Sequence, residues 1–387
     1  MVAEASTTIP LSTEPALRRG LYAADEQQVL TDLICSAEAA IDAHRYADAV
    51  AALDGNHPSP TGFPDLALRA LLAESWARMY LGEIQEALAL LERARAIVDG
   101  PGWTDVARAE VLYRLGCCRL KLSSIGTAVS LFTLALELCD RACVSCDRLR
   151  AHILEWRSRC YQRQRDWEAA RADVERALEL AQGIGDLHTA AHVYFQASLV
   201  AEREGQWLLA RYYAEQGKDL YERLDDRQNV GRLLNNLGGL YFLLGKPEEA
   251  ITHLKTAFRV ALEVDSKPDA AQAISSLAQV YLRTGEIELA EQQARQALEL
   301  LSGRVDFLDE IGNAQLVLGR SLLEQGRHDE AEELIRAADQ SFEQLSSVSH
   351  RAAAWVALGD LAVRRQDKDQ AASLYRQAAE ALQDFHF

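Results

Sequence analysis

Residues 232–257 contain two short apolar stripes separated by a break. In the first stripe, small and apolar residues recur at helical spacing, at Leu234, Leu237, Gly238 and Tyr241. Gly245 and Pro247 form the break, because glycine favours the end of one helix and proline fits the first turn of the next. The second stripe follows at Ala250, Leu254 and Ala257. The segment therefore predicts two amphipathic helices joined by a tight turn.

The same pattern recurs along the chain in a fixed register. Aligning other segments on Ala250 places an alanine early in the second helix of each unit, at Ala49, Ala87, Ala128, Ala170, Ala210, Ala250, Ala290, Ala331 and Ala371. Neighbouring alanines are 38 to 42 residues apart. A small residue stands twelve positions before most of them, and a glycine often stands five positions before. This regularity predicts one long array of about nine helical hairpins.

These features resemble the tetratricopeptide repeat. The usual repeat has about 34 residues, whereas a period near 40 resembles the longer variant of kinesin light chains, mitotic-spindle adaptors and bacterial peptide-pheromone receptors. The resemblance implies an all-α fold, a right-handed superhelical solenoid whose first helices line a concave groove. We expect residues 1–25 to be a disordered or loosely packed leader and residues 26–387 to be the solenoid, with a degenerate first repeat.

The first helix of each unit also carries residues outside its core stripe. At matching offsets these residues form ladders across the array, and two ladders contain Arg203, Gln279, Arg283 and Arg320. Four further residues around the NNLG run do not follow from the repeat pattern: Arg232, Asn235, Asn236 and Phe242. We predict that these residues bind a peptide or a segment of a partner protein in the groove.

The chemistry of these side chains suits such a ligand. Asparagine and glutamine offer donors and an acceptor to an extended backbone, and arginine can fork onto a carboxylate. In the repeats that this chain resembles, asparagines of the first helices grip the ligand backbone, which implies this role for Asn235 and Asn236. The alternative interpretation is structural, because the helix dipole favours arginine in a last turn and an asparagine can bond a neighbouring helix.

The net charge of the chain argues against some classes of binding partner. A formal net charge of −17 disfavours nucleic acid and anionic membranes. Arginines in the groove of so acidic a chain favour a ligand that carries carboxylates. The chain shows neither a signal-peptide pattern nor an apolar run of membrane-spanning length, so we expect a cytoplasmic protein.

Seven cysteines are an odd number, which argues against a disulfide framework. Cys139, Cys143 and Cys146 are the weak metal candidates, with Cys160 or His152 as a fourth zinc ligand. Their spacing also matches the cluster-binding loop of radical SAM enzymes, but the barrel strands of those enzymes are missing from the pattern. Our expectation is that the protein needs no cofactor and that these cysteines pack in a helix and a connection.

The sequence therefore predicts a non-catalytic protein that holds a peptide or partner segment, with a regulatory or scaffolding role. One alternative is a bacterial sensor of signalling peptides without its own DNA-binding domain. Another is a metal-binding or redox protein that uses the cysteine cluster. No further helix follows the last unit, so it could pair with a second copy, or Arg376, Gln377, Glu380 and Asp384 could cover its face.

Overall fold

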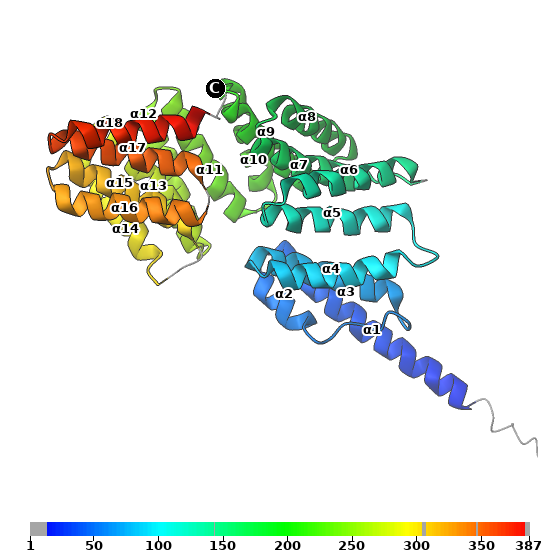
Figure 1. Cartoon of the computed structure of the whole chain (residues 1–387). Coiled ribbons are helices and arrows are strands. Elements are labelled where there is room, and N and C mark those ends of the chain that lie inside the picture. The colour runs from blue at the N-terminus through cyan, green and yellow to red at the C-terminus, as the bar shows by residue number, and fades with distance from the viewer. Residues whose placement is uncertain (1–13, 143, 304–306, 346, 384–387) are drawn as a thin grey trace, which may run out of the picture. The chain divides into compact units, whose positions relative to one another are not determined.

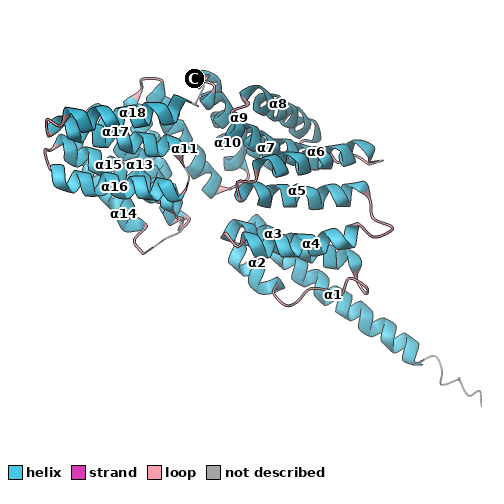
Figure 2. Ribbon diagram, viewed as in Figure 1, coloured by secondary structure: helices cyan, strands magenta, loops and turns pink. Residues whose placement is uncertain are grey.

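The computed structural model describes residues 14–142, 144–303, 307–345 and 347–383 (Figure 1). All regular secondary structure in these ranges is α-helical (Figure 2). The helices are α1 (Glu14–Asp42), α2 (Tyr46–Leu53), α3 (Pro64–Leu81), α4 (Ile84–Val98), α5 (Asp105–Lys121), α6 (Ile125–Arg141), α7 (Asp147–Gln164), α8 (Trp167–Ile184), α9 (Leu187–Arg203), α10 (Trp207–Arg223), α11 (Arg227–Leu243), α12 (Pro247–Glu263), α13 (Lys267–Thr284), α14 (Ile287–Leu300), α15 (Leu308–Glu324), α16 (His328–Gln344), α17 (Val348–Arg364) and α18 (Lys368–Gln383).

The chain forms two compact units, residues 1–180 and 181–387, which we name the N-terminal and the C-terminal unit. In the N-terminal unit the odd-numbered helices α1, α3, α5 and α7 contact one another in sequence, and so do α11, α13, α15 and α17 in the C-terminal unit. The even-numbered helices α2, α4, α6, α10, α12, α14 and α16 each pack between the odd-numbered helix before and the one after. Each unit therefore has a layer of first helices and a layer of second helices, which confirms the predicted helical hairpins.

The alanine register is also confirmed. All nine alanines used for the alignment lie in even-numbered helices, from α2 to α18. Eight of them are fully buried, and Ala371 in the last helix is 4% exposed. A methyl group at this position lets the second helix approach its neighbours closely, which is why the position repeats.

In the C-terminal unit, a size match between two residues sixteen positions apart accompanies the close packing of each hairpin. A Cβ atom built on Gly238 would lie 2.5 Å from Cγ of Leu254, and Gly319 and Gly359 face Ile335 and Tyr375 in the same way. Where the first helix has a larger residue, the second has a smaller one: the corresponding pairs in the C-terminal unit are Ser198 with Ala214 and Ala278 with Ala294, all buried. The sizes of the two side chains in a pair therefore differ from hairpin to hairpin, while the helices remain closely packed.

The turn inside each hairpin requires a left-handed residue five positions before the alanine. Glycine occupies it in five hairpins, at Gly82, Gly205, Gly245, Gly285 and Gly326, with φ between 74° and 87°. In the other four it is His44, Ser123, Arg165 or Gln366, with φ between 57° and 63°. A side chain in this conformation costs about 1–2 kcal/mol, so these four turns are tolerated rather than favoured.

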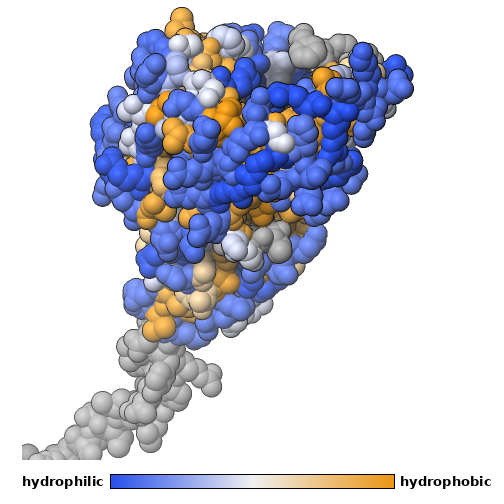
Figure 3. Space-filling view, turned by 90° about the vertical axis from the view of Figure 1, so that its left-hand side faces the viewer, coloured by the Kyte–Doolittle hydropathy of each residue, from blue (hydrophilic) through white to orange (hydrophobic). Residues whose placement is uncertain are grey.

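The two ends of the array differ from the simplest expectation. α1 begins at Glu14, so the part of the expected leader from residue 14 onward is helical, whereas residues 1–13 lie outside the described residues. Proline at position 15 fits the first turn of α1, and Ala, Leu, Arg and Glu follow as good helix formers. In α18 the described side chains include no large exposed hydrophobic residue, and Arg376 and Glu380 are exposed. Asp384 lies outside the described residues, and the face drawn in Figure 3 is mostly hydrophilic with separate apolar patches.

Gly238→Ala should destabilise the protein by about 1–3 kcal/mol, because its methyl group would overlap Leu254. In a Leu254→Ala background the penalty should disappear, since the pair then copies Ala278 and Ala294. Gly239→Ala is the matched control: position 239 is exposed, nothing lies within 4 Å of its added Cβ, and helix propensity predicts a gain of up to about 1 kcal/mol. Denaturant unfolding measures all four variants. Equal Gly238→Ala penalties in both backgrounds would contradict the size match.

Ser123→Gly should stabilise the protein by about 1 kcal/mol, because glycine adopts φ 58° without the strain that serine has there. Ser124→Gly, one residue later at φ −82°, should give no gain. Thermal unfolding of the two variants provides the test, and a Tm for Ser123→Gly at or below that of wild type would disprove the strain.

Candidate functional site

All eight residues predicted to bind a ligand lie in first helices of the C-terminal unit. Arg203 is in α9, four are in α11 (Arg232, Asn235, Asn236 and Phe242), Gln279 and Arg283 are in α13, and Arg320 is in α15. Two of them, Arg283 and Arg320, line one pocket of about 390 Å³. We name it the Arg283–Arg320 pocket; its other lining residues are Leu282, Thr284, Gly285, Ile287, Leu323, Glu324 and Asp360.

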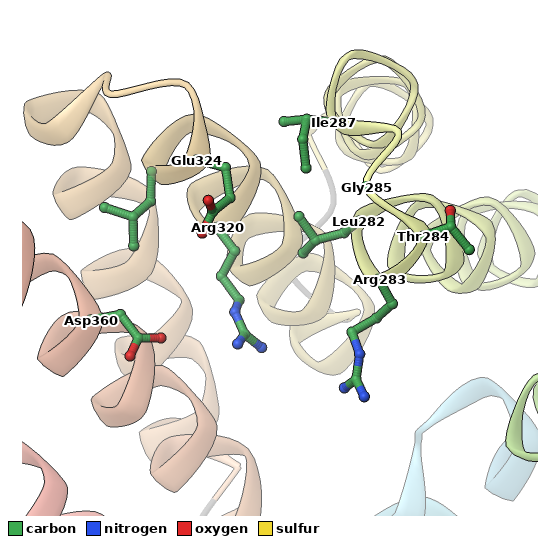
Figure 4. Close-up of a pocket in the computed structure, with 9 residues that line it drawn as sticks. Leu282, Arg283, Thr284, Gly285, Ile287, Arg320, Glu324 and Asp360 are labelled. Carbon is green, nitrogen blue, oxygen red and sulfur yellow. The ribbon is translucent and has the colours of Figure 1, made fainter.

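The fold places both cations and apolar side chains around this pocket. Gly285 ends α13 at φ 86° and turns the chain into α14, which brings Ile287 to the pocket beside Leu282. Arg283 and Arg320 come from the neighbouring helices α13 and α15 and extend to the same side (Figure 4). The pocket thus combines apolar contact surface with two guanidinium groups.

The two carboxylates of the pocket do not pair with its two guanidinium groups. Glu324 accepts hydrogen bonds from Arg364 Nη2 at 2.9 and 3.0 Å, and Asp360 accepts one from the Tyr375 hydroxyl at 2.7 Å. Burial and this hydrogen bond raise the pKa of Tyr375 to about 12, so the phenol remains a donor at neutral pH. Among the described residues, Arg283 and Arg320 have no hydrogen-bond or ion-pair partner. The carboxylates are therefore engaged and the guanidinium groups are available to an anion.

Arg232 has a structural partner instead. Its Nε donates to Oδ1 of Asp269 at 3.0 Å and so links α11 to α13. Burial alone would raise the pKa of Asp269, but Arg232 and hydrogen bonds from Ser266 and Gln228 outweigh burial and lower it. This pair accounts for Arg232 without a ligand.

The two asparagines have different surroundings. Nδ2 of Asn236 donates to Oγ of Ser198 at 2.9 Å, which ties α11 to α9 and matches the structural interpretation. Oδ1 of Asn235 is buried and accepts no hydrogen bond from the described residues, as is true of Oγ of Ser275 in α13. A buried polar atom without a partner is unfavourable, so Asn235 keeps its place among the candidate ligand contacts.

The other predicted residues are less informative. Phe242 packs against the apolar cluster that contains Leu254 and Tyr281. Arg203 and Gln279 are exposed and outside the Arg283–Arg320 pocket. Sequence reasoning also left out Glu324 and Asp360, although both stand on the same ladders as Arg283 and Arg320.

An aromatic and basic cluster on the first helices of the N-terminal unit was not predicted either. Its core is Trp76, Arg114, Trp156 and Arg159. The signal was present in the sequence, because Trp76 and Arg159 stand eleven positions before their alanines, as Arg320 does. The predicted site lies instead around the NNLG run, where the repeat pattern is clearest.

The cysteine candidates are buried. Cys139 and Cys146 are 1% and 7% exposed, and Cys146 Sγ donates to the Cys139 carbonyl at 3.6 Å, whereas Cys143 lies outside the described residues. Burial raises the pKa of Cys139 to about 12 and that of Cys160 to about 11, so both groups are protonated thiols at neutral pH in this structure. Within the described ranges, no three metal-ligating side chains come together, and no helix has the length and apolar character to cross a bilayer.

Comparison with known proteins identifies the repeat. A family model described as tetratricopeptide repeat matches residues 229–302 and 310–384. A sequence search of curated proteins found no match.

Solved structures share the fold over almost the whole chain at low identity. The apo form of RapI has a TM-score of 0.64 at 13% identity, covering 91% of this chain and 97% of RapI. The apo quorum sensor NprR from B. thuringiensis has 0.63 at 11%, covering 92% and 99%. NprR with its cognate peptide NprX has 0.58 at 12%, covering 80% and 88%. Aspartyl phosphate phosphatase F from Bacillus subtilis has 0.62 at 14%, covering 98% and 97%.

These matches agree with the buried alanine register and the two helical layers. The chain therefore carries tetratricopeptide repeats, which the family model matches directly in its C-terminal half, and has the helical-repeat fold of RapI and NprR.

Proposed function

We propose that the protein is a non-catalytic binding protein that holds a peptide, or an extended segment of a partner protein, on the first-helix layer of its C-terminal unit. The observation that carries the proposal is the Arg283–Arg320 pocket. Its two guanidinium groups are unengaged among the described residues, while its two carboxylates already have donors.

The pocket fits a carboxylate on a peptide. Arg283 and Arg320 extend to the same side, so together they can donate to one carboxylate from two helices (Figure 4). Leu282 and Leu323 supply apolar contact for the side chain of the same or a neighbouring ligand residue. Asn235, on the first helix α11, has a buried amide oxygen without a partner among the described residues, and a change of its side-chain rotamer would offer this oxygen to the N–H of a ligand backbone.

The comparisons support a peptide ligand. NprR is described as a quorum sensor and has been solved with its cognate peptide. A phosphatase also shares the fold, but fold likeness alone carries no activity to this chain. We propose a regulatory or scaffolding role in the cytoplasm, and a sensor of signalling peptides would use the same site.

Replacing both pocket arginines by Arg283→Gln and Arg320→Gln should weaken peptide binding about 100-fold or more, since each charged hydrogen bond contributes about 1.5–3 kcal/mol. The probes are peptides selected on the wild-type protein from a random library, labelled with fluorescein and followed by anisotropy. Arg295→Gln with Arg336→Gln is the control of equal charge, because these two lie exposed on second helices and pair within them. Unchanged affinity in the pocket variant, with unchanged helical content, would refute the site.

Variants of the two neighbouring asparagines test ligand binding separately from the stability of the fold. Asn236→Ala should lower the free energy of unfolding by about 1 kcal/mol, because it removes the hydrogen bond to Ser198. Asn235→Ala should leave stability unchanged or raise it, since it deletes an unpartnered buried oxygen, while it weakens binding of the selected peptides. The reverse assignment, with binding lost only in Asn236→Ala, would show that Asn235 is no ligand contact.

A further inference from the structure

Three first helices of the N-terminal unit join their aromatic side chains into one cluster, in which Tyr113 and Trp156 are buried, at 5% and 4% exposed. The ring of Trp76 in α3 lies 5.9 Å from Tyr113 in α5 and 5.9 Å from Trp156 in α7, measured between ring centres. Tyr80, one turn after Trp76, is 42% exposed and extends the cluster along α3. The aromatic cluster therefore crosses three repeats, and its exposed part is made by Trp76 and Tyr80 on α3.

Two arginines are held in place on this cluster. The guanidinium carbon of Arg114 lies 4.9 Å from the Trp76 ring centre, and that of Arg159 lies 4.6 Å from the Trp156 ring centre. Each is also bonded by a glutamate one turn earlier on its own helix: Nε of Arg114 donates to Glu110 at 2.6 Å and Nε of Arg159 to Glu155 at 2.8 Å. Because these contacts fix the side chains before any ligand arrives, binding an anion costs little further side-chain entropy.

The helices α5 and α7 contain more basic than acidic residues, although Arg150 and Arg157 pair with Asp140 and Asp173 of neighbouring helices. α7 contains five arginines but only one aspartate and one glutamate. α5 contains three arginines and one lysine, and also one aspartate and one glutamate. Arg163, exposed near the end of α7, donates only to the carbonyl of Leu120 at 3.3 Å and has no carboxylate partner among the described residues. A small positive excess thus remains on a chain whose net charge is −17.

We infer that this aromatic–arginine face, made of Trp76, Tyr80, Arg114, Trp156, Arg159 and Arg163, is a second binding site, and that it takes an acidic segment of a partner protein. Carboxylates of the segment bind Arg159 and Arg163, and its apolar atoms lie on the exposed parts of the Trp76 and Tyr80 rings, while the buried Trp156 holds Arg159 in place. The site belongs to the N-terminal unit and uses none of the residues of the Arg283–Arg320 pocket.

The charge distribution favours an acidic protein segment over nucleic acid. Glu110 and Glu155 lie within the face, so its local excess matches one or two carboxylates and not a continuous row of phosphates. The net charge of the chain repels a long polyanion more strongly than a short acidic segment.

The test uses the full chain carrying Arg283→Gln and Arg320→Gln, so that the pocket of the C-terminal unit does not compete. The probes are fluorescein-labelled hexaglutamate, the same peptide with glutamines, and an oligothymidylate of equal net charge, followed by anisotropy at low salt and at about 0.15 M salt. We expect hexaglutamate to bind, the glutamine peptide not to bind, and adding Arg159→Gln with Arg163→Gln to weaken hexaglutamate binding at least about tenfold.

Two further variants keep the test decisive. Arg141→Gln with Arg176→Gln removes the same charge from exposed positions on the second helices of this unit and should change the affinity less than about twofold. Arg163→Gln alone, which leaves the buried Glu155 paired, should weaken binding about threefold and keep the thermal unfolding curve of its parent.

If Arg159→Gln with Arg163→Gln and Arg141→Gln with Arg176→Gln weakened hexaglutamate binding equally, the inference would be overturned in favour of a general charge effect. Tighter binding of the oligothymidylate, or no binding of hexaglutamate at low salt, would overturn it as well. Because the pocket arginines are already replaced, each of these results leaves the proposed function of the C-terminal unit untouched.

Discussion

The close approach of the two helices within each hairpin is the contact on which the fold depends. Gly238 lets Leu254 rest directly on the backbone of α11, and the same arrangement recurs where Gly359 meets Tyr375. Only when this distance is fixed can the first helices form a regular layer, with side chains at equal offsets next to one another. The binding surfaces that we propose for both units depend on this regularity, since Arg283 and Arg320 reach one pocket only because α13 and α15 lie side by side.

The fold could be predicted from the sequence because each hairpin repeats the same local rule. An alanine, a small residue and a left-handed turn at fixed offsets determine which faces are buried, and a repeated pattern averages out the exceptions, such as Ser123 in a glycine position. The roles of individual polar residues were less accessible. That Asn236 bonds Ser198 and that Arg232 bonds Asp269 depends on the distance between neighbouring repeats and on side-chain rotamers, which spacing alone does not supply. Thus the ladder positions were identified, but ligand contacts and bonds between helices could not be told apart.

The two units present different electrostatic environments on equivalent helices. In the N-terminal unit, Arg114 and Arg159 are stacked on tryptophan rings and bonded by glutamates, so their positions are set in advance. In the C-terminal unit, Arg283 and Arg320 are free of partners among the described residues, and rotamers must be selected when a ligand arrives. The first arrangement favours fast, salt-sensitive capture and the second favours discrimination by fit.

The exchange of volume between paired residues also bears on how such a chain can change over time. In hairpins of the C-terminal unit, the residues at positions such as 278 and 294, or 238 and 254, lie opposite one another in the space between the two helices. Two successive substitutions can redistribute that space from one helix to the other without moving either backbone. Sequence identity can then fall pair by pair while the architecture stays the same, and relatives of such a protein are better found by summed side-chain volume at matched positions than by residue identity.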